Sequence, residues 1–153
     1  MALGHRPALL ALRQLSARSQ ESRFLFKAGS IFCQSKKYMP LLKVETSVAL
    51  SDEKRKGLLS SLSEIVAKTI GKPEQYVMVS INSAAMLMSA KPGDAAFVDV
   101  RSIGGLSNDV NRQLSQQVCA LLKESLGIPP ERVYLNFTDV EAEDWGWKGN
   151  TFG

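Results

Sequence analysis

The sequence predicts an α+β fold: a doubled β-α-β unit forming a four-stranded mixed sheet with two helices on one face. Two amphipathic stretches each lie between two strand-like stretches, which is the order of a β-α-β unit. The two halves also repeat, because Gly71 and Gly127, like Pro73 and Pro129, are separated by 56 positions. A strand, crossover helix and strand form a right-handed unit with parallel strands, so each half contributes two strands to the sheet.

The first half begins with strand character in "LLKVETSV". Ser51-Asp52 predicts the start of a helix, which Gly71 and Pro73 end. The helix has apolar residues at helical spacing, namely Leu58, Leu62, Ile65, Val66 and Thr69 or Ile70. The stretch "QYVMVSI", Gln75 to Ile81, is rich in β-branched and aromatic residues and predicts the second strand.

The second half repeats this order. The third strand is predicted in "FVDVRSI", Phe97 to Ile103, and Asn108 is expected to cap the next helix. That helix carries its apolar face on Val110, Leu114, Val118, Leu121 and Leu122. "GIPP", from Gly127, ends the helix, and "RVYLNF", Arg132 to Phe137, predicts the fourth strand.

Two helices on one side leave the other face of the sheet uncovered. "YVMVSI" and "VYLNF" are rich in apolar residues, and a two-layer domain offers nothing further to cover them. We therefore expect self-association around a symmetry axis. The alternative is that the outer positions are mixed and tolerated in water, because monomers expose much apolar surface.

The basic charge of the chain belongs to residues 1–39. The whole chain has a formal net charge of +4, but residues 1–39 hold seven Lys/Arg and one Glu, whereas residues 40–153 hold twelve Lys/Arg and fourteen Asp/Glu. The domain at 40–153 is therefore not expected to bind nucleic acid. No stretch approaches the roughly 18 consecutive apolar residues that a membrane span needs.

The extension at 1–39 has the composition of an organellar transit peptide, since it contains Arg, Ser, Ala and Leu with almost no acid. The alternative is an upstream start that is rarely used or wrongly assigned. A genuine presequence predicts a mitochondrial or plastid protein. Without one, we expect a cytoplasmic protein or one released from the cell.

Cysteine and histidine are scarce, which excludes several kinds of chemistry. The only histidine, His5, and one of two cysteines, Cys33, lie in the extension, which leaves Cys119 alone in the domain. The domain cannot form a His-based triad, a thioredoxin-like dithiol or a usual zinc site. We therefore expect no metal.

Five stretches of residues 39–153 follow the order and near-constant spacing of a known family. They are "MPLLKVETSV", "GKPEQYVMVSI", "SIGGL", "RVYLNFTD" and "WGWKGNTFG". Each is weak alone, but together they resemble the macrophage migration inhibitory factor and D-dopachrome tautomerase family. The resemblance implies the tautomerase fold, assembled as a homotrimer with active sites at the subunit boundaries. It also implies a cofactor-independent isomerase that acts on small aromatic keto acids of the phenylpyruvate or dopachrome type.

The resemblance assigns the catalytic base to Pro40, once removal of the preceding residues exposes its nitrogen. A prolyl nitrogen within a chain is an amide, whereas at a terminus it is a rigidly held secondary amine. Read without the family, Pro40 is an ordinary strand-initial proline. Lys72 would bind the substrate carboxylate or polarise its carbonyl; otherwise it is a cation near a helix C-terminus. The other half of the repeat carries Ile128 at this place.

The resemblance also assigns the substrate-binding residues. Ser102 and Ile103 end the third strand, and the Ile103 N–H would stabilise an enolate oxygen. The remaining members are aromatic or amide side chains, namely Tyr134 and Asn136 from the neighbouring subunit, with Asn136 reaching a phenolic hydroxyl, and Tyr76, Trp147 and Phe152 as an aromatic wall. Packing in the core or at an interface explains these side chains equally well.

The chain departs from the family pattern at three places. "MSAKPGD", Met88 to Asp94, replaces a common Phe-Gly-Gly turn, and "AAFV" replaces the Cys-x-x-Cys of some members. Trp145 stands where a smaller aliphatic side chain is common. The alternative function is a cytokine-like signalling or scaffold trimer with a receptor-type protein partner, in which the site is vestigial or a retained extension blocks Pro40.

Overall fold

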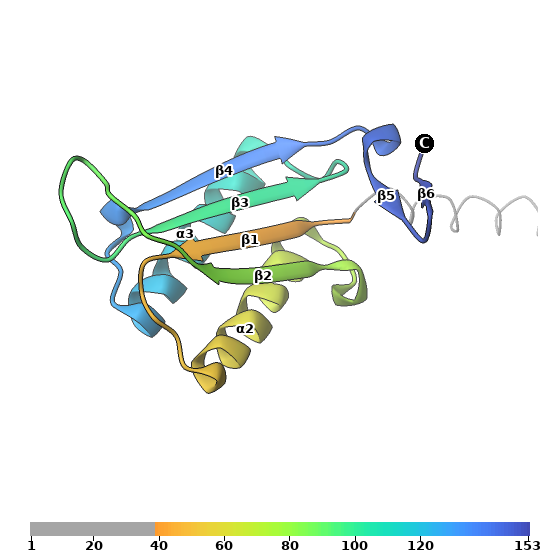
Figure 1. The fold of residues 1–153 in the computed structure, drawn as a ribbon. Helices are drawn as coiled ribbons and strands as arrows, with labels where there is room; N and C mark the ends of the chain where they lie inside the picture. The colour runs from red at the N-terminus through yellow and green to blue at the C-terminus, as the bar shows by residue number, and fades with distance from the viewer. Residues whose placement is uncertain (1–38) are drawn as a thin grey trace, which may run out of the picture. The chain divides into compact units, whose positions relative to one another are not determined.

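The computed structural model describes residues 39–153, so all but Met39 of the predicted transit peptide at 1–39 lies outside the described residues. The elements follow the predicted order (Figure 1): β1 Leu41–Thr46, α2 Asp52–Ile70, 3-10 helix η1 Glu74–Tyr76, β2 Met78–Ser83, β3 Ala96–Ser102, α3 Asn108–Leu126, 3-10 helix η2 Pro130–Arg132, β4 Val133–Asp139, 3-10 helix η3 Ala142–Asp144, β5 Gly146–Trp147 and β6 Asn150–Thr151.

The sheet has the strand order β2-β1-β3-β4. Strands β1 and β2 are parallel, β3 and β4 are parallel, and the two central strands β1 and β3 are antiparallel. The doubled β-α-β unit and the four-stranded mixed sheet are thus confirmed. Because the halves meet through antiparallel strands, β1 begins at the sheet edge where β3 and β4 end.

Local sequence signals explain the two helices, which are 19 residues long and 56 positions apart. Ser51 accepts the N–H of Lys54, and Gly71 ends α2 in the left-handed region at φ 74°. In the second half the cap is Ser107, which accepts the N–H of Val110 at 3.3 Å, so the prediction of Asn108 as the cap was wrong by one residue. Both residue types suit an N-cap, and only the backbone decides between neighbours.

Strand β3 is shifted by one residue from the predicted 97–103, and the boundaries of two other strands differ more. The predicted strand at 75–81 begins instead at Met78, and the predicted strand at 132–137 runs on to Asp139. Each is preceded by a single 3-10 turn, η1 or η2, that follows a proline. Proline fixes φ near −65°, which favours such a turn over immediate entry into a strand.

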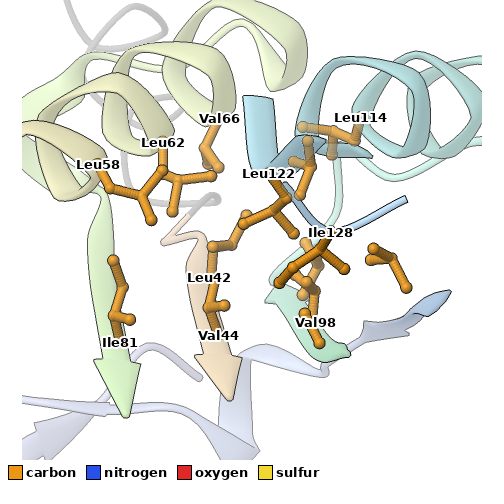
Figure 2. Close-up of a cluster of buried hydrophobic side chains, with 14 of the residues drawn as sticks. Leu42, Val44, Leu58, Leu62, Val66, Ile81, Val98, Leu114, Leu122 and Ile128 are labelled. Atoms are coloured by element: carbon orange, nitrogen blue, oxygen red, sulfur yellow. The ribbon is translucent and has the colours of Figure 1, made fainter. Parts of the chain in front are cut away.

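The core lies between one face of the sheet and both helices. Figure 2 shows side chains of α2 and α3 directed at β1, β2 and β3. The fully buried members include Leu42, Val44, Leu62, Val66, Val98, Val100, Leu114, Val118, Leu122 and Ile128. Since this cluster lies within residues 42–133, the described segment contains its own hydrophobic core.

The open face of the sheet carries both apolar and charged residues. The apolar residues Val79, Leu135 and Phe137 pack against the core instead. The open face carries exposed Met78, Phe97 and Tyr134 together with the ion pairs Lys43–Glu45 and Asp99–Arg101. Successive side chains of a strand point to opposite faces of the sheet, so these two sets of residues lie on different faces. A count of the apolar residues in a strand does not reveal this.

Within residues 39–153, no helix combines the length and apolar character that crossing a membrane requires.

Candidate active site

Pro40 lies immediately before β1 and is fully buried. Its carbonyl oxygen accepts the N–H of Met78 at 3.0 Å, which attaches it to the start of β2. Continuing the register that pairs Leu41 with Arg101 places Ser102 opposite Pro40. In the full chain Met39 precedes this proline, so its nitrogen is an amide without useful basicity.

Lys72 lies in the turn that joins α2 to η1. Its backbone N–H donates to Ala67 at 2.8 Å, directly after the left-handed Gly71. Because β1 and β2 are parallel, this turn and Tyr76 lie at the edge where β1 begins. Partial burial lowers the pKa of the Lys72 amine, since removal from water disfavours the charged form.

Ser102 and Ile103 reach the same edge from the antiparallel strand β3. Both residues are buried, and within 39–153 the Ser102 hydroxyl has no hydrogen-bond partner. The next residue, Gly104, has φ 65° and donates its N–H to the Asp139 carboxylate at 2.6 Å. A side chain would strain this left-handed turn, so glycine allows the chain to leave the strand here.

The C-terminal segment adds an aromatic pair. The Trp147 and Phe152 rings stack at 5.9 Å between centroids, with 10° between their planes. Lys148 Nζ lies 4.3 Å from the centre of the Trp147 ring, within cation–π range. The hairpin β5–β6, which pairs Trp147 with Asn150, was missed from the sequence; its signal is the Lys148-Gly149 turn, where both residues have positive φ.

Tyr134 and Asn136 do not join this edge within one chain. Both point to the open face, and Tyr134 lies near the start of β4. Since β4 is parallel to β3 and β3 is antiparallel to β1, Tyr134 lies at the end of the sheet opposite Pro40. It lines a separate hollow of about 370 Å³ together with Phe97 and residues 85–89.

Asn136 contacts a carboxylate that sequence reasoning missed. Its side-chain nitrogen donates to Asp99 Oδ1 at 3.1 Å and to Thr138 Oγ1 at 3.2 Å. The signal was the alternation along the third strand, which places Asp99 on the same face as Phe97 and Arg101. Among the residues at 39–153, no group of three His, Cys, Asp or Glu side chains could hold a metal ion.

One edge of the sheet therefore gathers a buried proline, a lysine with a lowered pKa, the Ser102-Ile103 strand end and Tyr76. Such an edge can bind an anionic oxygen and polarise a neighbouring carbonyl. A nucleophile or base is supplied only if the proline nitrogen becomes an amine.

The chain matches known proteins over this segment. The family model for macrophage migration inhibitory factor matches residues 39–153. The macrophage migration inhibitory factor of Meriones unguiculatus is 37% identical over 115 residues, with 74% of this chain and 99% of that protein covered. Residues 39–153 therefore correspond to nearly the whole length of this relative.

Solved structures agree. A homologue from Prochlorococcus marinus is 38% identical with a TM-score of 0.71, and covers 74% of this chain and 99% of its own. A macrophage migration inhibitory factor-like protein from Entamoeba histolytica is 31% identical with a TM-score of 0.72 and the same coverage. Both sequence and fold are therefore shared with these proteins.

Proposed function

The chain belongs to the macrophage migration inhibitory factor family, and from that premise we propose that its processed form is a keto-enol tautomerase. The substrate is a small aromatic keto acid of the phenylpyruvate or dopachrome type. The observation that carries the proposal is that Pro40, Lys72, Ser102 and Ile103, which are distant in the sequence, lie at one edge of the sheet.

Pro40 acts as the general base after the residues before it are removed. Its secondary amine takes the proton from the carbon next to the keto group, and the electron pair moves to the carbonyl oxygen. The enolate oxygen then receives a proton, so the reaction is an isomerisation and needs no redox partner. A model α-amine titrates near 7.7–8.0, and burial lowers the pKa of an amine, which suits a base at neutral pH.

Lys72 and the Ile103 N–H stabilise the charge that develops on the substrate. The Lys72 ammonium attracts the carboxylate or the enolate oxygen, and a fixed backbone donor at the strand end binds the same charge. Tyr76, Trp147 and Phe152 supply apolar contact with the ring. A partly desolvated lysine interacts more strongly with an anion than a fully hydrated one.

The working assembly is a homotrimer in which each site is completed by its neighbour. Tyr134 and Asn136 lie away from Pro40 on the open face of the same chain, which supports their contribution to the pocket of another copy. Rotational symmetry allows each subunit to give one part of a site and receive the other.

Intact-mass measurement of the protein from its native source tests the proposed processing. A terminus at Pro40 supports catalysis, and a mature chain that keeps Met39 or earlier residues contradicts it. In the chain that begins at Pro40, Pro40→Gly is expected to lose most phenylpyruvate tautomerisation and remain trimeric. Unchanged turnover would remove Pro40 from the mechanism.

A second candidate is a cytokine-like signalling or scaffold trimer with a receptor-type partner. It is favoured by the amide character of the Pro40 nitrogen in the full chain. In this case the extension persists and blocks the site. Under the first proposal the extension directs the protein to the mitochondrion or plastid and is then removed, because it has the composition of a transit peptide.

A further inference from the structure

An arginine directly before β4 binds the loop that joins β2 to β3, residues 84–95 (Figure 1). Arg132 Nε donates to the carbonyl oxygen of Asp94 at 2.6 Å. Its Nη2 donates to the carbonyl oxygens of Gly93 at 3.0 Å and Lys91 at 3.3 Å. A guanidinium stays charged and carries its donors in a fixed fork, so this one side chain holds three carbonyl groups of the loop.

The same loop contains a strained turn. Met88 and Lys91 pair across it: the Lys91 N–H donates to Met88 at 3.0 Å, and the Met88 N–H donates to Lys91 at 3.4 Å. The two residues between them, Ser89 and Ala90, have φ of 55° and 56°. Turns of this kind favour glycine and asparagine, because other side chains crowd the backbone in the left-handed region. The turn therefore needs support from outside, and Arg132 supplies it at the Lys91 carbonyl.

The loop also forms part of the hollow of about 370 Å³ described above. Residues 85–89 line this hollow from the loop, and Phe97 and Tyr134 line it from the sheet. Arg132 lies two residues before Tyr134, at the end of η2. The arginine therefore ties together two parts of the chain that line the hollow.

We infer that Arg132 is a positioning residue that holds the Ser89-Ala90 turn in place and so fixes the wall of the hollow beside Tyr134. The inference rests on the proposed function, in which Tyr134 completes the site of a neighbouring subunit. Without the arginine the loop populates other conformations, and a substrate binds only the fraction that keeps the wall. The apparent affinity falls with this fraction, whereas the chemical step at Pro40 does not change.

Hydrogen exchange of backbone amides tests the hold on the turn without any substrate. In Arg132→Gln the amides of Met88 and Lys91 should exchange at least about tenfold faster than in the wild type, because hydrogen bonds from a charged donor are lost. The amides of the central strand β3 should keep their wild-type rates, which separates local opening from a general loss of stability. Unchanged exchange at both positions of the turn overturns the inference.

A second substitution removes the strain instead of the support. Glycine adopts φ 56° without crowding, so Ala90→Gly in the Arg132→Gln background should slow the exchange of the turn again by about threefold or more. Ala84→Gly is the control for this step, because Ala84 lies in the same loop without a positive φ. If Ala90→Gly restores no more protection than Ala84→Gly, the arginine does not act on a strained turn, and the inference is wrong.

Turnover of phenylpyruvate by the chain that begins at Pro40 tests the effect on the site. That chain contains the whole core cluster and matches relatives over nearly their full length. Arg132→Gln should raise KM about three- to tenfold and leave kcat within about twofold, and Ala90→Gly should bring KM back toward the wild-type value. A merely structural role lowers the amount of active protein, and so kcat, at constant KM. An unchanged KM beside faster exchange overturns the inference, because the loop would then not wall the site.

Arg112→Gln is the matched control for the loss of an arginine. Arg112 pairs with Asp109 at 3.5 Å on the surface of α3, so its replacement should change neither the exchange of the turn nor KM. An equal rise in KM would contradict the inference, because the charge of the chain would then control the affinity. If the wild type turns over no phenylpyruvate, the tautomerase proposal fails, and the exchange rates still decide whether Arg132 holds the turn.

Discussion

At the scale of single residues, Lys72 combines a charge with partial burial. Burial lowers its pKa, so raising the pH removes its charge earlier than that of an exposed lysine. The kcat/KM for phenylpyruvate is therefore expected to fall on the alkaline side with an apparent pKa below 10.5. Arginine stays protonated throughout this range, so Lys72→Arg should move the alkaline limb to higher pH.

Lys68→Arg serves as the control for this pH profile. Lys68 is exposed and pairs with Glu64 at 3.0 Å on the surface of α2, so its replacement should leave the profile unchanged. If Lys72→Arg keeps the wild-type alkaline limb, another group controls it, and Lys72 does not hold the charge of the substrate.

Candidate site residues could be chosen from the sequence mainly because the family motifs surround them. Spacing alone could not bring Pro40, Lys72 and Ser102 together, since this depends on the antiparallel contact between the two halves. Asp99 was missed because a single acid in a strand looks like a solvated surface residue. Its hydrogen bond with Asn136 depends on the register that places the two residues opposite each other.

At the scale of elements, α2 has one glycine inside the helix and another at its C-terminal cap, in opposite situations. Gly57 lies inside the helix, and a Cβ added there would contact nothing within 4 Å. Gly57→Ala should raise the free energy of unfolding by about 0.5–1 kcal/mol, because alanine loses less conformational entropy in a helix. Gly71 has φ 74°, which strains any other residue, so Gly71→Ala should lower the free energy of unfolding by about 1–2 kcal/mol.

Urea denaturation of the two variants and the wild-type domain measures both effects. The pair is internally controlled, because both substitutions add one methyl group to the same helix and its cap. Equal changes in the two variants would show that backbone conformation does not determine the outcome. A Gly71→Ala protein as stable as the wild type would contradict the role of the left-handed cap.

Both helices and their ends were predictable, apart from the N-cap of α3, which lies one residue before the predicted Asn108, because their signals are local. Hydroxyl caps, apolar residues at helical spacing and terminal glycines act within a few residues of one another. The 3-10 turns before β2 and β4 made the strand boundaries differ from the prediction. A run of β-branched residues predicts a strand but does not show at which residue hydrogen bonding to the neighbouring strand begins. The β5–β6 hairpin was not predicted, because strands of only two residues show no alternation of apolar and polar side chains.

At the scale of the whole molecule, the proposed site is divided between two copies of the chain. A mixture of two inactive proteins tests this division: one carries Pro40→Gly, and the other carries Tyr134→Ala with Asn136→Ala. If subunits exchange freely, about a quarter of the sites in an equal mixture combine an intact proline with an intact neighbour. Phenylpyruvate turnover should recover to about that fraction of the wild-type value.

A mixture that stays inactive after refolding together would show that each chain supplies its own Pro40, Tyr134 and Asn136. Light scattering on the same samples should give the mass of three chains. The sequence predicted the layers of one subunit well, because its core closes within residues 42–133. Self-association was expected from the apolar residues of the uncovered face, whereas the number of three subunits came from the family resemblance alone; the open face itself also carries ion pairs.

The turns that end α2 and α3 both begin with a glycine in the left-handed region, but the residues that follow these glycines have different roles. Ile128 is fully buried in one, whereas Lys72 occupies the corresponding place in the other and keeps part of its surface in water. Because the unit is duplicated within one chain, the two turns can carry different side chains. One copy packs an apolar residue into the core, and the other carries a charged residue without disturbing that packing. A protein assembled from identical half-length chains would have to accept a single compromise at both turns.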